Sequence, residues 1–406
     1  MTILIIGGGA SGMMAALTAA RLGASVVLLE RQARVGRKLL ATGNGRCNLT
    51  NLDAGPAHYH GGDGSFCRPA LAAFPPQAAR DFFRALGLLT VAEPSGRVYP
   101  YTDQANSVLD VLRFALEHEG VDVRTGWEVR RIWRRREGFL LKTAGGDVAG
   151  DRLIVAAGGA AGGKLGGTTM GYELLEALGH GRTALFPALV QLVTGGAVTR
   201  SLKGVRAPAR VTVCRGGRVL AESRGEVQFT ETGVSGPAVF DVSRAASAGG
   251  PGVTVALDLL PDLPPESLEA LLLDRCRALP ERPCEEWLVG ILHNRLGRVL
   301  VRAAGLPASS PLGEMGRDEV RRLAALLQSF SLPVTGTQGM ESAQVTAGGI
   351  ATDGFSPETL ESRRTPGLYA CGEVLDVDGD CGGYNLHWAW ASGRLAGRSA
   401  AGEGLG

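Results

Sequence analysis

The chain has 406 residues, of which 45% are hydrophobic and 20% are charged, and its formal net charge at pH 7 is +2. This length can bury the cores of two or three domains, and the near-neutral charge argues neither for nor against a nucleic-acid partner. No run of about eighteen apolar residues occurs, which excludes a helix that spans a membrane, and the 60 glycines form no repeat.

The cysteines and histidines also narrow the class of protein. The seven cysteines are irregularly spaced and none forms a C-x-x-C motif, which is typical of a reducing compartment and argues against a disulfide reductase. The apolar N-terminus is interrupted by glycines and lacks the basic segment of a signal peptide, so we expect a cytoplasmic protein. The six histidines lack the spacing of metal ligands, and no metal site is predicted.

The first thirty residues predict a dinucleotide-binding βαβ unit. Residues 2–6 are an apolar run that predicts a buried strand, residues 11–22 are small and apolar as in a helix, and residues 25–30 predict a second strand. Residues 7–12, which join the first strand to the helix, fit the pattern G-x-G-x-x-G. The second strand ends on Glu30, where a carboxylate can accept hydrogen bonds from ribose hydroxyls.

Each glycine of this pattern has a separate physical role. Gly7 allows the tight turn, Gly9 lets the backbone approach a pyrophosphate, and Gly12 lets the helix pack closely on the strand. The free N–H groups and the dipole of the helix start hold the phosphates. The alternative is a glycine-rich turn of purely structural use.

Residues 41–51 predict a polar loop whose glycines leave little to pack into a core. Its backbone polar groups need partners, and a bound cofactor is one candidate, with a surface Ω-loop as the alternative. Helices are then expected at 74–86 and within 102–119, and strands at 121–125, 128–134 and 139–143. The arginines between 130 and 136 are expected at the exposed end of a β-hairpin rather than in an RNA or membrane patch.

A further buried strand at 151–157 runs into Gly158 and Gly159. This segment lacks the G-x-G-x-x-G order, so one dinucleotide site is predicted. A helix is expected at 169–178. From about residue 190 short strands at 209–214, 218–222, 226–230 and 253–257 give way to helices at 266–278, 285–305 with a break near Gly297, and 317–329.

The last segment returns to strands and glycines. A strand at 367–371 is followed by Gly372 and Glu373, and Gly382 and Gly383 precede a helix whose start offers a second cradle for an electron-rich group. Asp376, Asp378 and Asp380 alternate as in a calcium loop, but the glycine and glutamate of that loop are missing, so calcium is not predicted.

At this point the chain resembles the HI0933-like bacterial flavoproteins, also called the BaiN-like or aminoacetone oxidase family. The resemblance spans nearly the whole chain and rests on residues 7–12, 36–38, 43–51, 96–100, 229–237, 346–349 and 367–393. Members often carry histidine where this chain has Glu231.

The resemblance implies an α/β fold: a Rossmann-like FAD-binding domain built from both chain ends, with an inserted β-barrel and helical domain. The expected boundaries are 1–189 and 341–406 for the FAD-binding domain and 190–340 for the insert, with the barrel at about 190–260 and the helical part at about 261–330.

The resemblance also implies which residues hold FAD. Those expected at the pyrophosphate, ribose and adenine are Gly7, Gly9, Ser11, Gly12, Glu30, Arg31, Lys38, Val129, Ala157, Gly158, Gly372 and Glu373. Those expected beside the isoalloxazine are Asn44, Gly45, Asn48, Gly383, Tyr384, Asn385 and Leu386. A helix start at the pyrimidine edge would stabilise the negative charge of the reduced flavin.

The expected function is FAD-dependent hydride transfer, from NADH or NADPH to a conjugated C=C or from a small oxidisable molecule. Arg46, Cys47, Tyr384 and His387 are the candidate catalytic residues. Cys47 and His387 have structural alternatives as packing residues, whereas Arg46 is the best candidate for binding an anion. Two alternative functions stay open: reduction of a base in structured RNA, and a non-enzymatic flavin-dependent sensor.

Overall fold

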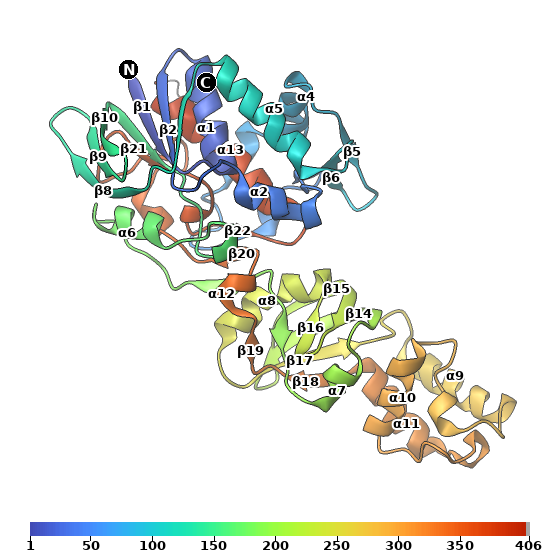
Figure 1. Ribbon diagram of the computed structural model, residues 1–406. Coiled ribbons are helices and arrows are strands. Elements are labelled where there is room, and N and C mark those ends of the chain that lie inside the picture. Colours follow the sequence, from blue (N-terminus) through green and yellow to red (C-terminus); the bar gives the residue numbers. More distant parts are fainter. Residues whose placement is uncertain (403–406) are drawn as a thin grey trace. The chain divides into compact units, whose positions relative to one another are not determined.

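The computed structural model describes residues 1–402, and the chain divides into two compact units, residues 1–186 with 344–402 and residues 187–343. The first unit is built around a parallel five-stranded sheet in the order β21-β11-β1-β2-β7. Its strands β21, β1 and β2 are labelled in Figure 1. The five strands are β21 (Leu368–Ala370), β11 (Arg152–Val155), β1 (Thr2–Ile6), β2 (Ser25–Glu30) and β7 (Asp122–Thr125). The sheet therefore takes β21 from the C-terminal segment and the other strands from the N-terminal one, as the sequence predicts.

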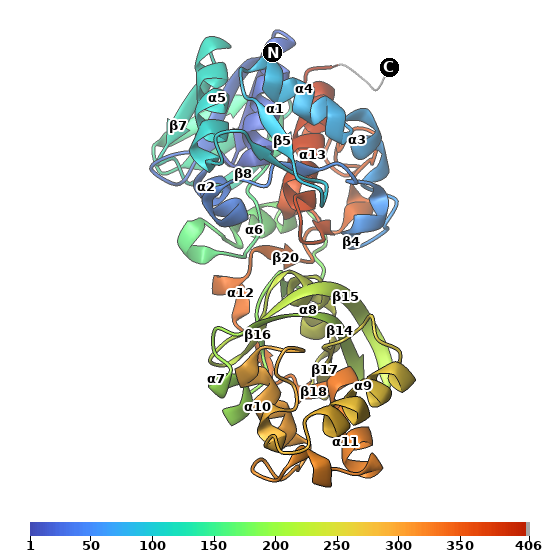
Figure 2. The same ribbon diagram turned by 90° about the vertical axis from the view of Figure 1, so that its right-hand side faces the viewer.

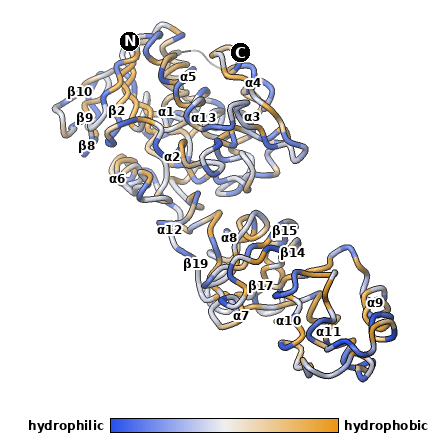
Figure 3. The backbone as a smooth tube through the Cα atoms, turned by 45° about the vertical axis from the view of Figure 1, so that its right-hand side comes forward, coloured by the Kyte–Doolittle hydropathy of each residue, from blue (hydrophilic) through white to orange (hydrophobic). Residues whose placement is uncertain are grey.

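The hydrophobic residues of β1 and β2 explain why these strands lie buried at the centre of the sheet. Residues 3–5 are fully buried, as expected for a parallel strand covered on both faces, and Figure 3 shows the apolar character of these strands. Two helices, α1 (Ala10–Arg21) and α13 (Tyr384–Ala400), pack on each other (Figure 2). Glycines allow this packing: a Cβ atom on Gly393 would lie 2.3 Å from Ser11 O, and one on Gly397 would lie 2.5 Å from Ala15 O.

Smaller elements surround the central sheet of the first unit. The antiparallel strands β8 (Val129–Arg134), β9 (Phe139–Thr143) and β10 (Gly146–Gly150) form one sheet, and β3 (Thr50–Asn51), β6 (Arg97–Pro100) and β5 (Thr90–Ala92) form another. β4 (Tyr59–His60) pairs with β22 (Asp378–Gly379). The other helices and strands of this unit are α2 (Arg37–Ala41), α3 (Arg68–Ala73), α4 (Pro76–Ala85), α5 (Ala105–His118), α6 (Met170–Glu176) and β20 (Val345–Ala347). β12 (Phe186–Ala188) begins at the last residue of the segment 1–186 and continues into the second unit.

The second unit has a seven-stranded antiparallel sheet and a helical part. The strand order is β18 (Phe330–Pro333), β17 (Val253–Asp258), β14 (Arg206–Arg215), β15 (Arg218–Phe229), β16 (Gly233–Ser235), β13 (Leu192–Val193) and β19 (Gly336–Thr337). The helices are α7 (Ala197–Ser201), α8 (Pro237–Gly249), α9 (Pro265–Ala278), α10 (Asn294–Ala303), α11 (Arg317–Gln328) and α12 (Gly339–Ser342). The closure of these strands into a barrel stays a prediction.

Four expected elements, two helices and two strands, differ from the structure. The helix expected at 74–86 begins at Pro76, because proline fits the first turn of a helix but not its interior. The strands expected at 218–222 and 226–230 are one strand, β15, since both halves pair with β14. The helix expected at 285–305 is only α10, which runs unbroken through Gly297; the irregular stretch precedes it, at 287–293.

Candidate functional site

The loop between β1 and α1 has the geometry of a dinucleotide cradle. Gly7 has φ +107°, and a Cβ atom there would lie 2.3 Å from Ala156 O, so only glycine makes this turn. A Cβ atom on Gly12 would lie 1.9 Å from Gly7 O, which forces the close packing of helix on loop. Beside Gly9, by contrast, a Cβ atom would meet nothing within 4 Å. This open side lies at the start of α1, where no side chain caps the free N–H groups.

Glu30 fixes this loop from the end of β2. Its carboxylate accepts hydrogen bonds from Gly8 N and from Gln32 N, each at 2.7 Å. Each carboxylate oxygen has further lone pairs, so the same side chain can also accept bonds from ligand hydroxyls. The next residue, Arg31, donates to Gly166 O at 2.8 Å and therefore holds the turn after β11 rather than standing free.

The C-terminal segment completes the cradle at Gly372. This glycine has φ +75°, and a Cβ atom on it would lie 2.4 Å from Ser11 Oγ of α1. Two side chains of α13 hold its backbone: Gly372 N donates to Ser392 Oγ, and Trp388 Nε1 donates to Gly372 O. The start of α1 and the end of β21 are thus held in one rigid arrangement.

Glu373 links three parts of the site. Its Oε2 accepts from Lys38 Nζ at 2.7 Å, and its Oε1 accepts from Thr346 N at 2.9 Å. A Cβ atom on Gly159 would lie 2.6 Å from Glu373 Oε1, so this carboxylate also packs against the turn after β11. In that turn Ala157 and Gly158 are half-buried, and Gly158 has φ +74°. Val129 is the first residue of β8 and is buried.

Residues 42–48 form a strained loop. Asn44 and Cys47 have φ values of +57° and +63°, which non-glycine residues rarely adopt, and Gly43 and Gly45 are also left-handed. Asn44 is exposed, whereas the Oδ1 atom of Asn48 is buried without a hydrogen-bond partner. A buried acceptor without a donor is costly, and a donor from a ligand would satisfy it.

Polar contacts tie residues 49–51, which follow this loop, to α13 and to the turn before it. Thr50 Oγ1 lies 2.9 Å from His387 Nδ1, and Trp390 Nε1 donates to Leu49 O at 2.9 Å. Asn51 Nδ2 donates to Gly382 O at 3.0 Å. A Cβ atom on Gly383 would lie 2.6 Å from Thr50 O, so the loop and the start of the helix are in direct backbone contact.

The start of α13 is a second uncapped helix N-terminus. Gly382 and Gly383 have φ values of +142° and +102°, and no side chain caps the helix. The Asn385 side chain instead holds the preceding loop, accepting from Gly379 N and donating to Gly379 O. Tyr384 is buried and Leu386 is half-buried. The free N–H groups and positive dipole end of this helix suit an electron-rich ligand atom.

The four candidate catalytic residues have different environments. Burial raises the pKa of the Cys47 thiol to about 12, and burial lowers the pKa of His387 to about 4. Both side chains are therefore neutral at pH 7. Arg46 bonds to Asp103 and Glu93 and lies 4.0 Å from the ring centroid of Tyr99. The charge of Arg46 is compensated by these two carboxylates. Tyr384 is the first residue of α13.

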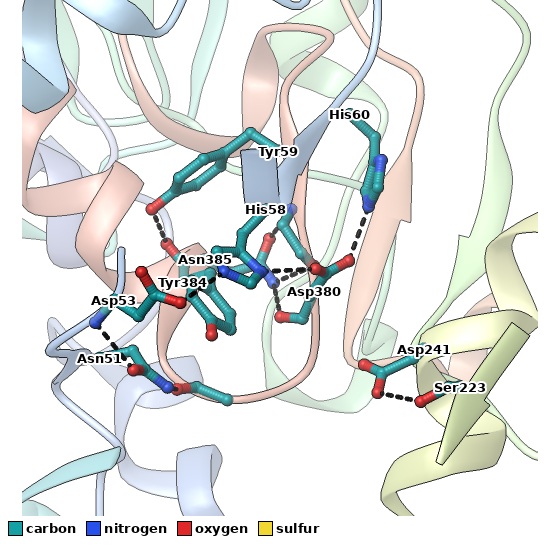
Figure 4. A network of polar contacts seen from close by, with 12 residues as sticks. Asn51, Asp53, His58, Tyr59, His60, Ser223, Asp241, Asp380, Tyr384 and Asn385 are labelled. Atoms are coloured by element: carbon teal, nitrogen blue, oxygen red, sulfur yellow. Dashed lines mark hydrogen bonds and ion pairs between the residues drawn. The ribbon is translucent and has the colours of Figure 1, made fainter. Parts of the chain in front are cut away.

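Sequence reasoning missed one polar network beside Tyr384. His58 Nδ1 lies 2.9 Å from Asp380 Oδ2, His60 Nε2 lies 2.6 Å from Asp380 Oδ1, and His58 Nε2 lies 3.2 Å from Asp53 Oδ2 (Figure 4). The His58 ring stacks on Tyr384 with centroids 4.3 Å apart. The signal in the sequence was the pair of alternating histidines, but their partner Asp380 is more than 300 residues away.

The two uncapped helix starts, the open side of Gly9 and the glycine turns define a Rossmann-type dinucleotide-binding protein. A family model described as HI0933-like protein Rossmann domain matches residues 1–399, and the chain belongs to this family. Within residues 1–402, no helix has the length and apolar character that a membrane span requires.

Three relatives match along almost their whole length. The chain is 41% identical over 405 residues to a 3-dehydro-bile acid delta(4,6)-reductase of Clostridium scindens, covering 98% of both chains. It is 33% identical over 392 residues to a ribosomal RNA dihydrouridine synthase of Escherichia coli, covering 96% of this chain and 95% of the relative. The identity to the Haemophilus influenzae ribosomal RNA dihydrouridine synthase is 30% over 399 residues, covering 96% of each chain. Because the family model and these relatives match nearly the whole chain, we conclude that the protein is a FAD-dependent oxidoreductase and not a non-enzymatic sensor.

Proposed function

We propose that this protein reduces a conjugated C=C bond of a small, largely apolar molecule of steroid-like class, with hydride supplied by NADH or NADPH. The observation that carries this proposal is the 41% identity, over 98% of both chains, to a reductase of a 3-dehydro-bile acid. In the insert, Glu231 is exposed and pairs with Lys203 at 2.8 Å, so this proposal assigns it no contact with the substrate.

The residues of the site fit FAD on three features of this structure. The space beside Gly9, next to the free N–H groups of α1, suits the pyrophosphate, with Gly7, Ser11 and Gly12 shaping the turn. The carboxylate of Glu30 can accept further hydrogen bonds, and we propose that it accepts them from the hydroxyls of the adenosine ribose.

The third feature lies at the end of the proposed site where the isoalloxazine ring would bind. The uncapped start of α13 at Gly383 and the buried, unsatisfied Asn48 Oδ1 offer donors and an acceptor to a polar ring edge. Lys38 and Glu373 would close the site near the pyrophosphate and ribityl chain. The remaining residues that we propose to contact FAD are Arg31, Asn44, Gly45, Val129, Ala157, Gly158, Gly372, Tyr384, Asn385 and Leu386.

Bound FAD supplies the hydride chemistry, and the chain's own residues position and polarise it. With FAD bound as proposed, the start of α13 would offer partial positive charge to the ring edge at which electron density increases on reduction. Reduction of a C=C bond also needs a proton. Cys47 holds its proton too tightly and His387 is unprotonated at pH 7, while Arg46 is held by two carboxylates. Of the four candidates this leaves the Tyr384 hydroxyl as the proposed proton donor.

Anaerobic mixing tests the proposal. The purified protein should show a flavin spectrum that NADH or NADPH bleaches, and a Δ4-3-oxosteroid should restore the oxidised spectrum with formation of the saturated product. Tyr384→Phe should bleach at the wild-type rate but slow the restoring step. If neither nucleotide reduces the flavin and an unsaturated steroid does not reoxidise it, the proposed reaction is wrong.

A second candidate function is reduction of a uridine in ribosomal RNA, which is favoured by two relatives at 33% and 30% identity. The arginine hairpin of β8 and β9 gives this candidate little support. Arg130 lies 3.6 Å from Glu128, and Arg134 donates to Gly138 O, so both side chains are engaged within the hairpin. The two candidates separate when unmodified ribosomal RNA and a Δ4-3-oxosteroid compete for reduced enzyme: dihydrouridine formation measured by mass spectrometry would favour the second.

A further inference from the structure

A carboxylate shared by two histidines lies directly before α13. Asp380 accepts from His58 through Oδ2 and from His60 through Oδ1, and its own N–H donates to His58 O at 3.0 Å. The pairing of β4 with β22 sets this arrangement, because it places Asp378 opposite His60 and Gly379 opposite Tyr59. Tyr59 adds a bond from its hydroxyl to Tyr384 O at 3.0 Å. The segment 58–60 and the start of α13 therefore form one connected unit (Figure 4).

The geometry selects the protonation state of His58. Its two ring nitrogens face two different carboxylates, Asp380 at 2.9 Å and Asp53 at 3.2 Å. Ionised carboxylates only accept hydrogen bonds. A neutral imidazole could therefore donate to one carboxylate, and its unprotonated nitrogen would face an oxygen of the other carboxylate without a hydrogen between them. Only the imidazolium donates to both. Partial burial of His58 opposes its charge, but the bonds to Asp380 and Asp53 outweigh that effect and raise its pKa.

This cation lies against the first residue of α13. The ring of His58 is stacked on that of Tyr384 at 4.3 Å with an interplanar angle of 19°. A cation over an aromatic face is attracted by the electrons of the ring. His60 has no such contact in the described chain, although it shares the same carboxylate. Of the two histidines, His58 is therefore the one whose charge acts on Tyr384.

We propose that His58 is a positioning residue that carries a positive charge against Tyr384, holds the first turn of α13 against the cofactor, and favours the reduced cofactor. This inference rests on the proposed placement of FAD at the start of α13. Hydride transfer to the cofactor adds one proton and two electrons and so adds one negative charge. A positive charge on His58, at the start of α13, would therefore lower the free energy of the reduced cofactor. Loss of the His58 proton at high pH removes this stabilisation.

The first test is the midpoint potential of bound FAD between pH 5.5 and 9, with His58→Asn as the variant. Asparagine can keep the bond to Asp380 but has neither the charge nor the ring. At low pH, the preference of the variant for reduced over oxidised FAD should be weaker than that of the wild type by about twofold or more, because the variant lacks the positive charge. Above the pKa of His58 the two proteins should agree. Identical profiles over the whole range would overturn the proposal.

Two more variants separate this role from a purely structural one. His60→Gln keeps a donor to Asp380 and should leave the pH profile of the potential unchanged. Asp53→Asn changes an exposed side chain, removes one carboxylate from His58, and should move the pH-dependent step to lower pH. A profile that follows His60 instead of His58, or an unmoved step in Asp53→Asn, would contradict the proposal. These variants also keep the test decisive if His58→Asn fails to fold.

A measurement without FAD distinguishes this inference from the proposed function. NMR titration of the histidine ring signals in apoprotein, assigned with the His58→Asn and His60→Gln variants, should give His58 a pKa above about 6.5. A His58 that titrates at or below that value overturns the inference even if FAD binds as proposed. If His58 titrates as expected but the protein takes up no FAD, the proposed function fails instead.

Discussion

Lys38 Nζ and Glu373 Oε2 lie 2.7 Å apart although 335 residues separate them in the sequence. Lys38 belongs to the helix that follows β2, and Glu373 belongs to the turn that follows β21. The pair therefore joins the two chain ends on the side of the proposed cofactor. Both side chains are partly buried, with exposed fractions of 31% and 21%, so the pair is screened less than a fully exposed ion pair.

Lys38→Met should lower FAD affinity more than it lowers stability. Removal of one partner of a part-exposed pair costs about 1 kcal/mol or less in unfolding free energy. In contrast, the loss of a positive charge next to the proposed pyrophosphate should weaken FAD binding about tenfold. Fluorescence titration of apoprotein with FAD checks this. Arg113→Met, which removes an exposed partner of Asp110, is the control and should bind FAD normally. Equal FAD affinity in the two variants would show that Lys38 is not part of the FAD site.

Glu30→Gln should weaken both the loop and FAD binding. The carboxylate accepts from two backbone N–H groups, whereas an amide offers a single acceptor oxygen and turns N–H donors toward the other group. An unsatisfied backbone donor costs about 1–3 kcal/mol, which urea denaturation of the apoprotein should detect. The exposed Glu117→Gln variant serves as control. Unchanged stability would show that the contact of Glu30 with Gly8 does not hold the loop.

His387 should make the protein less stable as the pH falls. Its pKa is about 4 in the folded chain, because the ring is buried, and about 6.5 when unfolded. Between these values the unfolded chain binds a proton that the folded chain does not, so stability is present above pH 6.5 and decreases toward pH 4. The full effect is about 3 kcal/mol.

Denaturation of His387→Asn and wild type at pH 7.5, 6 and 5 isolates this effect, because other groups titrate equally in both proteins. The stability difference between them should shrink as the pH falls. The exposed His118→Asn variant should instead run parallel to the wild type. A constant difference between His387→Asn and wild type would mean that the ring is not held neutral.

Cys47 should not react as a thiol in the folded protein. Burial raises its pKa to about 12, and the reactive thiolate is therefore scarce at pH 8. Treatment with an aromatic disulfide reagent, followed by peptide mass mapping, should label the half-buried Cys214 and Cys381 first and Cys47 only after unfolding. Modification of native Cys47 at the rate of Cys381 would restore a redox role for this residue.

The sequence predicts those parts of the site that depend on local geometry. The turn at Gly7, the close packing at Gly12 and the position of Glu30 at the end of β2 follow from spacing within thirty residues, and the structure has these local features, whereas the contact of Glu30 with a ribose stays a prediction. The helix start after Gly383 is equally local.

Contacts between distant segments were not predictable in the same way. The pairing of His58 with Asp380 depends on the register of β4 with β22, which no local pattern specifies. The unbroken β15 depends likewise on its long pairing with β14. The burial of Cys47 and His387, which decides their pKa values, also comes from tertiary packing rather than from their neighbours in sequence.

The most direct test of a FAD site at the start of α1 compares Gly9→Val with Gly12→Val. A side chain at Gly9 meets no protein atom within 4 Å, whereas one at Gly12 collides with Gly7 O at 1.9 Å. Flavin absorbance at 450 nm (~1 FAD per wild-type chain expected) and thermal unfolding of the apoproteins are measured together. Gly9→Val should unfold like the wild-type apoprotein but retain no FAD, and Gly12→Val should be destabilised with or without FAD. Full flavin occupancy in a folded Gly9→Val protein would contradict the account.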